Sequence, residues 1–378
     1  EASLRQVFLS HQAEPAHALY RNLVAPAEAR LRGKRHVFLA PDDLLYKLPF
    51  ETLLTQPFSS TKNAAVSVIG IEWQTAPFWV NSHAITYLPS LSVLRSLRQF
   101  GKAADPAQRP LIAFANPDFG SSGVAPQSAN RAATRSAILH TLKARRAMTG
   151  VTLPPLPDTY QEALHVARIL GAKPEQDLFV GTRASEYNVK HLRLNQYRNL
   201  LFATHGLMAG DFGPGTQPAL ALSFVGDPEN DGLLEMGEIL GLDLNADLVV
   251  LSACNTASGS GGEDRGEGFA GLTRSFMYAG AKSLLVTQWS VESSSAARLV
   301  QSTFARMADS PGSEALARAK RDMISGDVRM RISQDTEISL SHPFFWAPYI
   351  LVGDKGKQGS GSLNLRVPKN GSSEASVG

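Results

Sequence analysis

The chain has 378 residues, 43% of them hydrophobic and 19% charged, and a net charge of +3 from 37 basic and 34 acidic residues spread along the sequence. This composition predicts a soluble globular protein, and the even spread of charge argues against a nucleic-acid or membrane surface. A single cysteine rules out an internal disulfide, and neither a spanning run of roughly 18 apolar residues nor a signal-peptide layout is visible, so we expect a cytoplasmic protein. Because the chain begins with Glu1 rather than Met, we also expect it to be a fragment of a longer protein.

The first hundred residues predict alternating strands and helices. Residues 1–33 carry apolar positions at helical spacing, interrupted by prolines, and indicate two short helices. "RHVFLAPDDLLYKLPFETLL" predicts a strand, a turn and a second apolar element, and "HAITYLPSLSVLRSLRQF" predicts a strand followed by a helix. The apolar side of that helix is expected to carry Leu91, Leu94 and Leu97. Strand-then-helix units favour an α/β layering.

From Pro110 the alternation of strands and helices becomes regular. It is interrupted after the first strand by residues 120–158, which are rich in Gly, Ser, Ala and Pro. Several expected strands are continuous apolar runs, which is typical of strands covered by helices on both faces. The expected strands are "PLIAFANPDF", "DLFVG", "NLLFATHG", "PALALSF", "ADLVVLSAC", "AKSLLVTQW" and "FFWAPYILVG". The expected helices are "TYQEALHVARIL", "ASEYNVKHLRL", "LLEMGEILGL", "GFAGLTRSFMYAG" and 293–324, the last split at Pro311-Gly312.

Two of these strands each end in a group suited to nucleophilic catalysis. His205 follows "LLFAT" and Cys254 follows "LVVLSA", and the carboxyl ends of such strands collect the working residues of open α/β sheets. An imidazole can take the proton of a neighbouring thiol, and histidine 49 residues before cysteine matches the order and spacing of caspase-type proteases. The backbone amides of Gly206 and Cys254 could form an oxyanion hole. Taken singly, a lone cysteine or histidine is more often structural.

Three other motifs do not support a site. "GEGFAG", 266–271, has the dinucleotide-binding spelling but begins 12 residues beyond Cys254, too far from the strand, and we expect its glycines to let the helix pack close to the sheet. "SGSGG" is not the nucleophile elbow of serine hydrolases, and the nine histidines show no zinc-binding spacing. We therefore expect no zinc site. The acid-rich stretch 227–247 is interpreted as a solvated helix face.

The sequence resembles the CHAT domain family, caspase-like cysteine peptidases often fused to tetratricopeptide repeats in bacteria. The resemblance runs from about Leu19 to Gly353 and includes, in order, "LYRNLVAPAEARLRGKRHVFLAPDDLLYKLPFETLL", "ITYLPSLSVL", "FATHG", "VVLSACNTASG", "GEGFAGLTRSFMYAGAKSLLVTQWSV" and "PFFWAPYILVG". It implies a caspase-like α/β sandwich: a mostly parallel sheet of about six strands with helices on both faces, plus a smaller N-terminal subdomain. We expect that subdomain at 1–108, the peptidase core at 109–353 and a disordered tail at 354–378.

The resemblance also implies a cysteine endopeptidase with Cys254 as nucleophile, His205 as base, and a protein or peptide substrate. It implies no metal and no organic cofactor. Such domains are often latent, so an upstream repeat module or an activating partner would order the loops at 209–217 and 255–266. The alternatives are a catalytically silent CHAT scaffold and, more remotely, a nucleotide-binding protein.

The residues that would line the substrate pocket follow less directly from the sequence. Related proteases that cut after basic residues commonly carry an Asp two places before the cysteine, where this chain has Ser252, so a strong preference for Arg or Lys is not supported. Asp211, Glu263 or Asp264 could still supply an acid from neighbouring loops, although solvation is their more common role. Further expected substrate contacts are Ala253, Gln288, Trp289, Ser290 and Glu292. The segment 288–290 would pair with the substrate backbone, unless Trp289 only covers the core.

Overall fold

A single large sheet forms the centre of the molecule. The computed structural model describes residues 13–59, 68–103, 105, 107–119, 153–207, 217–225, 227, 229–252, 265–289, 292–331 and 337–354. Within them, eight strands pair in the order β1-β3-β14-β11-β10-β6-β4-β5. Their bounds are β1 (His36–Leu39), β3 (Ala84–Tyr87), β4 (Ile112–Ala115), β5 (Leu178–Val180), β6 (Asn199–Ala203), β10 (Leu248–Leu251), β11 (Ser283–Thr287) and β14 (Tyr349–Gly353). All neighbours are parallel except β11 and β14.

The predicted α/β sandwich is confirmed, including a sheet of six strands from 109–353. The N-terminal segment does more than pack on this sheet, because β1 and β3 extend it beyond β14. Two smaller sheets accompany it in the described residues. They consist of β2 (Val68–Ile69), β12 (Arg329–Arg331) and β13 (Glu337–Ser339), and of β7 (Gly206–Leu207), β8 (Ala219–Ala221) and β9 (Leu233–Glu235).

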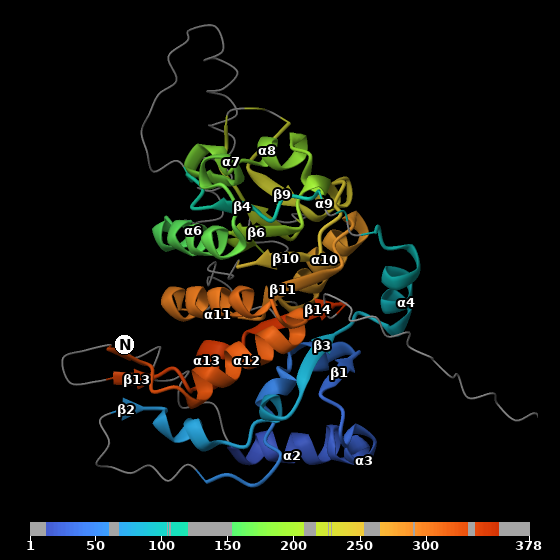
Figure 1. The fold of residues 1–378 in the computed structure, drawn as a ribbon, viewed down its shortest axis with the longest axis vertical. Helices are drawn as coiled ribbons and strands as arrows, with labels where there is room; N and C mark the ends of the chain where they lie inside the picture. The colour runs from blue at the N-terminus through green and yellow to red at the C-terminus, as the bar shows by residue number, and fades with distance from the viewer. Residues whose placement is uncertain are drawn as a thin grey trace, which may run out of the picture.

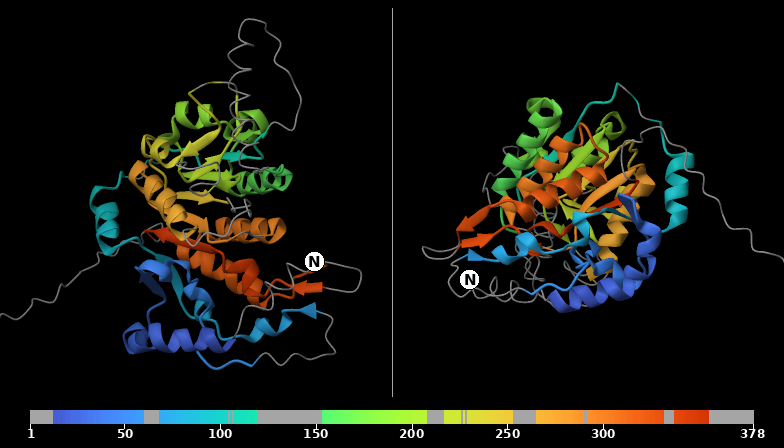
Figure 2. Two further views of the ribbon diagram at one scale, coloured as in Figure 1. Left: turned by 180° about the vertical axis from the view of Figure 1, so that it is seen from behind. Right: turned by 60° about the horizontal axis from the view of Figure 1, so that its bottom comes forward.

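Helices cover both faces of the sheet, as continuous apolar strands require. One face packs against α6 (Pro157–Leu170), α11 (Ser293–Arg306), α12 (Gly312–Ser325) and α13 (Pro343–Trp346). The other packs against α8 (Glu186–His191), α9 (Met236–Leu240) and α10 (Arg265–Ala279). The remaining α-helices are α2 (Ala13–Leu23), α3 (Glu28–Leu31), α4 (Leu91–Phe100) and α7 (Pro174–Asp177). Figures 1 and 2 show these layers, with α2 and α3 at one end and α4 at the side.

Short 3-10 turns make up much of the N-terminal segment, which contains η1 (Ala25–Ala27), η2 (Asp43–Lys47), η3 (Phe50–Thr52), η4 (Ile71–Thr75) and η5 (Trp79–Asn81). Two further turns, η6 (Gly181–Arg183) and η7 (Leu194–Gln196), lie later in the chain. The second apolar element of the segment after β1 is therefore two such turns, η2 and η3. The helix expected within residues 1–12 lies outside the described residues.

Three elements differ from their predictions. The helix expected at "LLEMGEILGL" begins only at Met236, because residues 233–235 pair with β8 as a strand. The strand expected at "FFWAPYILVG" begins with the turn α13, where Pro343 occupies the first helical position and the His342 ring caps the Phe344 amide. On α4, Leu97 contacts the core as predicted, whereas Leu91 is 70% exposed and the other core contact comes from Val93.

The chain order of the strands marks one place on the sheet. From β4 the chain moves outward to β5, then returns to the other side of β4 as β6. In open α/β sheets, ligands bind beyond the carboxyl ends of the strands at such a reversal. The residues after β4, β6 and β10 therefore surround the position where a site is expected.

Candidate active site

The two strands predicted to deliver the dyad are direct neighbours. β6 and β10 pair in parallel, from Leu248 opposite Asn199 to Leu251 opposite Phe202, and every pair in this register is separated by 49 residues. The pairing continues past β10, where the Ser252 amide donates to the Phe202 carbonyl at 3.0 Å. Cys254 and Ala253 lie outside the described residues, as do Asp211, Ser290, Glu263 and Asp264.

His205 is held in one orientation by its surroundings. The side chain is buried, with 1% of its surface exposed, and its ring lies 5.2 Å from that of Phe119, centroid to centroid. Its Nε2 lies 2.8 Å from the Pro154 carbonyl oxygen. Because a carbonyl only accepts, this contact assigns the proton to Nε2 and makes Nδ1 the basic nitrogen of the neutral ring.

Burial also sets the charge state of this imidazole. Removal from water lowers the pKa of His205 from its usual 6.5, against a smaller opposing effect of the Pro154 carbonyl. The neutral ring is therefore favoured near pH 7. A neutral imidazole is the form that can accept a proton from a thiol.

Gly206 lies at the start of the short strand β7, opposite Leu220 of β8. The ladder bond beside this pair runs from the Ala221 amide to the His205 carbonyl at 2.9 Å, so Gly206 and Leu220 form the non-hydrogen-bonded kind of antiparallel pair. The Gly206 amide is consequently not used by the ladder. The Thr204 hydroxyl also donates to the Ala221 carbonyl and ties the end of β6 to the same strand.

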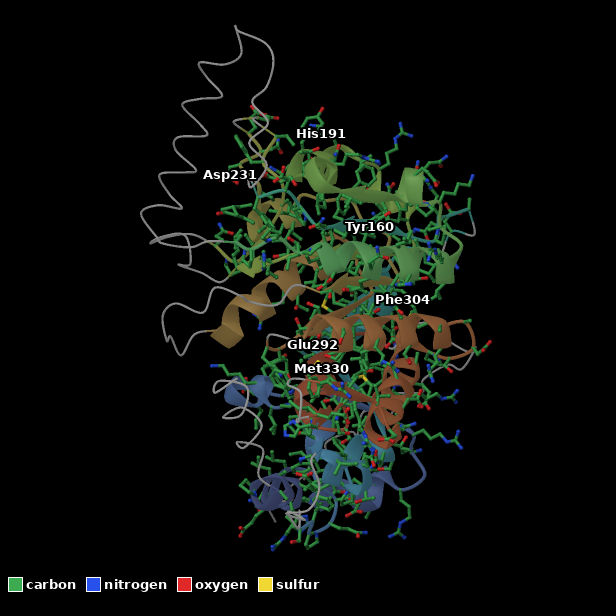
Figure 3. All side chains as sticks on the ribbon, turned by 90° about the vertical axis from the view of Figure 1, so that its left-hand side faces the viewer. Tyr160, His191, Asp231, Glu292, Phe304 and Met330 are labelled. Carbon is green, nitrogen blue, oxygen red and sulfur yellow. The ribbon has the colours of Figure 1, made fainter. Side chains whose placement is uncertain are left out.

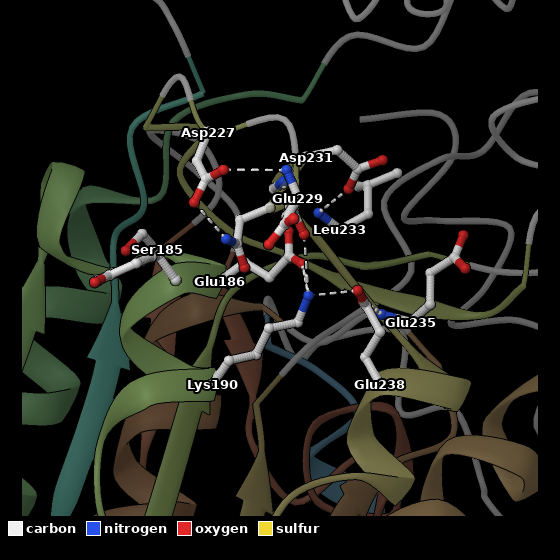
Figure 4. Close-up of polar contacts among 12 residues, drawn as sticks. Ser185, Glu186, Lys190, Asp227, Glu229, Asp231, Leu233, Glu235 and Glu238 are labelled. Atoms are coloured by element: carbon white, nitrogen blue, oxygen red, sulfur yellow. Dashed lines mark hydrogen bonds and ion pairs between the residues drawn. The ribbon is translucent and has the colours of Figure 1, made fainter.

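A charged cluster links the three-stranded sheet of β7, β8 and β9, called the hairpin sheet below, to α8 and α9. Glu186 of α8 is buried, and its Oε2 accepts from the Gly232 amide at 2.7 Å. Gly232 has a φ of +88°, and a side chain there would meet the Leu222 carbonyl at 3.0 Å. Lys190 joins Glu186 to Glu238, 2.5 Å away on α9 (Figure 4). Burial is the main cause that raises the pKa of Glu186 to about 7, and Lys190 opposes it.

Ser252 belongs to a second buried polar group. Its hydroxyl lies 3.3 Å from Oε2 of Glu162 on α6 and 3.2 Å from the Tyr349 hydroxyl on β14. Glu162 is 4% exposed, and burial raises the pKa of its carboxyl to about 7. Sequence reasoning missed Glu162, although a signal was present. The residue stands one turn before Val166 on the face of α6 that packs against the sheet.

The remaining described pocket residues also have structural contacts. Gln288 Nε2 donates to the Tyr46 carbonyl at 2.7 Å, and Trp289 packs against the core of the α6 and α11 face. Glu292 caps α11, because its carboxylate accepts from the backbone amides of Ser294 and Ser295 at 2.8 Å each. Figure 3 shows Glu292 at the start of α11, beside α6, which carries Tyr160. Their roles toward a substrate stay predictions.

The described residues contain neither a group of three or more His, Cys, Asp or Glu placed to hold a metal ion nor a helix long and apolar enough to cross a membrane. Glycine at 271 of "GEGFAG" does serve packing, since a Cβ there would lie 2.5 Å from the Met236 sulfur of α9. Its neighbour is thus a helix on the same face, not the sheet.

Comparison with known proteins assigns the family. The model of the CHAT domain matches residues 13–354, most of the chain. The chain belongs to the CHAT domain family. Membership places this CHAT domain in a caspase-like peptidase family, as the sequence motifs predicted.

Two curated relatives and two solved structures are similar to this CHAT domain. Tetratricopeptide repeat protein 28 of Mus musculus is 29% identical over 237 residues, 55% of this chain and 9% of the relative, and the Homo sapiens protein of that name is 27% identical with the same coverage. The chain thus spans less than a tenth of the length of these relatives. The Saccharomyces cerevisiae separase–securin complex has 14% identity and a TM-score of 0.35, covering 74% of this chain and 14% of that one. The Arg-specific cysteine proteinase gingipain R has 9% identity and a TM-score of 0.45, covering 89% and 69%.

Proposed function

We propose that this CHAT domain is a cysteine endopeptidase whose dyad is His205 and Cys254. The observation that carries the proposal is the fixed imidazole at the end of β6, with Nε2 on the Pro154 carbonyl, beside the strand that leads to Cys254. The separation of His205 and Cys254 equals the 49-residue offset of every described pair between β6 and β10. The proposal takes this offset to continue beyond the described strands, so that the two residues would share one register position at the ends of neighbouring parallel strands.

The proposed reaction divides hydrolysis into acylation and deacylation. His205 Nδ1 takes the thiol proton, and the Cys254 thiolate attacks the scissile carbonyl to form a tetrahedral intermediate. The backbone amides of Gly206 and Cys254 stabilise its oxyanion. The Gly206 amide is suited to this role because the β7–β8 ladder does not use it. His205 then gives its proton to the leaving amine. Water, activated by the neutral imidazole, releases the acyl group from Cys254.

Regulation by a neighbouring module is part of the proposal. The curated relatives are tetratricopeptide repeat proteins, and this chain matches 9% of their length. We therefore propose that a repeat module or bound partner controls access to the dyad in the full-length protein. The loops 209–217 and 255–266 flank the two proposed catalytic residues in sequence and are the segments through which such control would act.

A cleavage profile tests the activity. The chain is incubated with a proteome-derived peptide library, and new amino termini are identified by mass spectrometry, with Cys254→Ala as the matched control. The proposal expects cleavage sites that disappear in Cys254→Ala and fall at least about 100-fold in rate in His205→Ala, as expected on loss of a general base. Identical profiles for wild type and Cys254→Ala would instead favour the silent scaffold.

A further inference from the structure

One oxygen of the buried Glu162 carboxyl has no hydrogen-bond partner among the described residues. Oε2 accepts from the Ser252 hydroxyl, whereas Oε1 is inaccessible to water and has no hydrogen-bond partner among the described residues. Burial and the Ser252 hydroxyl are the influences on this carboxyl, with no cation among them. Buried polar atoms are normally satisfied, so a side chain aimed inward with one oxygen unpaired calls for an explanation.

The place of Glu162 in the fold provides one. Its partner Ser252 directly follows β10 and precedes the proposed nucleophile by two residues. Alternate residues of an extended strand share a face and lie about 7 Å apart. Ser252 continues the alternation of Leu248 and Val250, whose side chains pack on the α6 side of the sheet. Glu162 reaches this face from α6.

The neighbours of the carboxyl leave one oxygen for a ligand. The Ser252 hydroxyl lies between Glu162 and the Tyr349 hydroxyl, so the three groups form a polar wall within an otherwise apolar layer. Ser252 has a small side chain and holds Oε2, which orients the carboxyl and leaves Oε1 as the open acceptor. An acceptor of this kind is best satisfied by a cation that also donates hydrogen bonds.

We propose that Glu162 forms the base of the pocket for the substrate residue whose carbonyl is attacked, and that it selects arginine or lysine at this position. The inference rests on the proposed function, because it takes Cys254 as the nucleophile. In the proposed complex, the side chain of the attacked residue extends from the reacting carbonyl to the polar wall of Glu162, Ser252 and Tyr349, where its guanidinium or ammonium group pairs with Glu162. The acid thus comes from α6, and the neutral side chain at 252 orients it.

Binding to an inactive protein tests the pocket separately from catalysis. Acetyl-Ala-Ala-Ala-Arg amide and the same peptide with citrulline, a neutral isostere of arginine, are titrated calorimetrically into Cys254→Ala. We expect the arginine peptide to bind at least about 10-fold more tightly, and Glu162→Gln to remove the difference. Asp158→Asn, which loses an exposed carboxylate from the same helix, should leave it intact. Equal affinities for the two peptides, or a preference that survives Glu162→Gln, would overturn the inference.

Hydrolysis of the corresponding fluorogenic peptides by the active chain gives the second readout. The ratio of kcat/KM for arginine over citrulline should fall at least about 10-fold in Glu162→Gln, while the citrulline rate changes little. Equal losses on both peptides would show a structural role and contradict the inference. Selective binding without hydrolysis would keep the Glu162 pocket and refute the peptidase. Hydrolysis without arginine selectivity would support the peptidase and refute the Glu162 pocket.

Discussion

At the scale of single residues, burial sets the chemistry of both the imidazole and the carboxyl near the candidate dyad. It lowers the pKa of His205 and raises that of Glu162 to about 7, so the neutral imidazole is favoured near pH 7 and the carboxyl is protonated far more than an exposed one. For His205 the neutral form is the one that the reaction needs. For Glu162, burial penalises the carboxylate, and a cationic ligand would offset this penalty.

The raised pKa of Glu162 predicts a pH-dependent stability. The folded state binds this proton more tightly than the unfolded state, so the stabilisation is fully present below pH 4.5 and is lost as the pH rises through about 7. Glu162→Gln cannot ionise and escapes this loss. Relative to wild type, its free energy of unfolding should gain roughly 2–3 kcal/mol between pH 5 and pH 8. Urea unfolding at the two pH values measures the difference. Asp158→Asn should follow wild type, and parallel behaviour of Glu162→Gln would contradict the assignment.

At the scale of elements, the hairpin sheet after β6 determines where His205 and Gly206 lie. Its β9 end is fixed by the Glu186 carboxyl on the Gly232 amide, and Lys190 links that carboxyl to α9. Glu238 also accepts from the Glu235 amide at 2.8 Å, which joins α9 to β9. The four short elements α8, β8, β9 and α9 therefore support the segment that carries His205 and Gly206 through one ion cluster.

Removing the cation from this cluster should loosen the hairpin. Lys190→Met leaves Glu186 buried without its counter-charge, and we expect a loss of about 2 kcal/mol in unfolding free energy, less than for a fully buried pair because Lys190 is 23% exposed. The double variant Glu186→Gln/Lys190→Met should recover part of that loss. A double-mutant cycle by chemical denaturation checks this. Simple additivity of the two changes would show that Glu186 and Lys190 do not interact energetically within α8, and would contradict the role of Lys190 as the counter-charge of Glu186.

Most strands and helices were predictable because they depend on local patterns, whereas the dyad stays a prediction. Apolar runs ending in "ATHG" and "SAC" indicate buried parallel strands, and the strand register follows once two strands are neighbours. The short apolar run at 233–235 was assigned to a helix because its pairing with β8 is a tertiary contact. Glu162 was missed for the same reason, since its partner Ser252 lies 90 residues away and no local pattern connects them.

At the scale of the whole molecule, the N-terminal segment and the peptidase core share one sheet and one buried ion pair. Lys320 of α12 donates to Glu51 of η3 at 2.8 Å, and both side chains are almost completely buried. Tyr87 of β3 donates to the other Glu51 oxygen at 2.5 Å. The partners Glu51 and Lys320 are 269 residues apart in sequence, so no local pattern indicates their contact.

This pair should couple the two regions in unfolding. Lys320→Met strands the Glu51 charge in the interior, and we expect a loss of about 3–5 kcal/mol, with partial recovery in Glu51→Gln/Lys320→Met. Tryptophan fluorescence reports partly on Trp73 and Trp79 of the N-terminal segment, whereas far-UV circular dichroism reports on all elements. We expect coincident transitions by the two probes in wild type. Separate transitions would show that the regions unfold independently.

The reactivity of Cys254 tests the central claim most directly. Because it is the only cysteine in the chain, intact-protein mass spectrometry reads its alkylation by iodoacetamide without ambiguity. A His205-activated thiolate should react near pH 6 at least about 10-fold faster than free cysteine, whose pKa is about 8.5, and His205→Gln should abolish the excess. A wild-type rate equal to that of free cysteine, and unchanged in His205→Gln, would contradict the dyad.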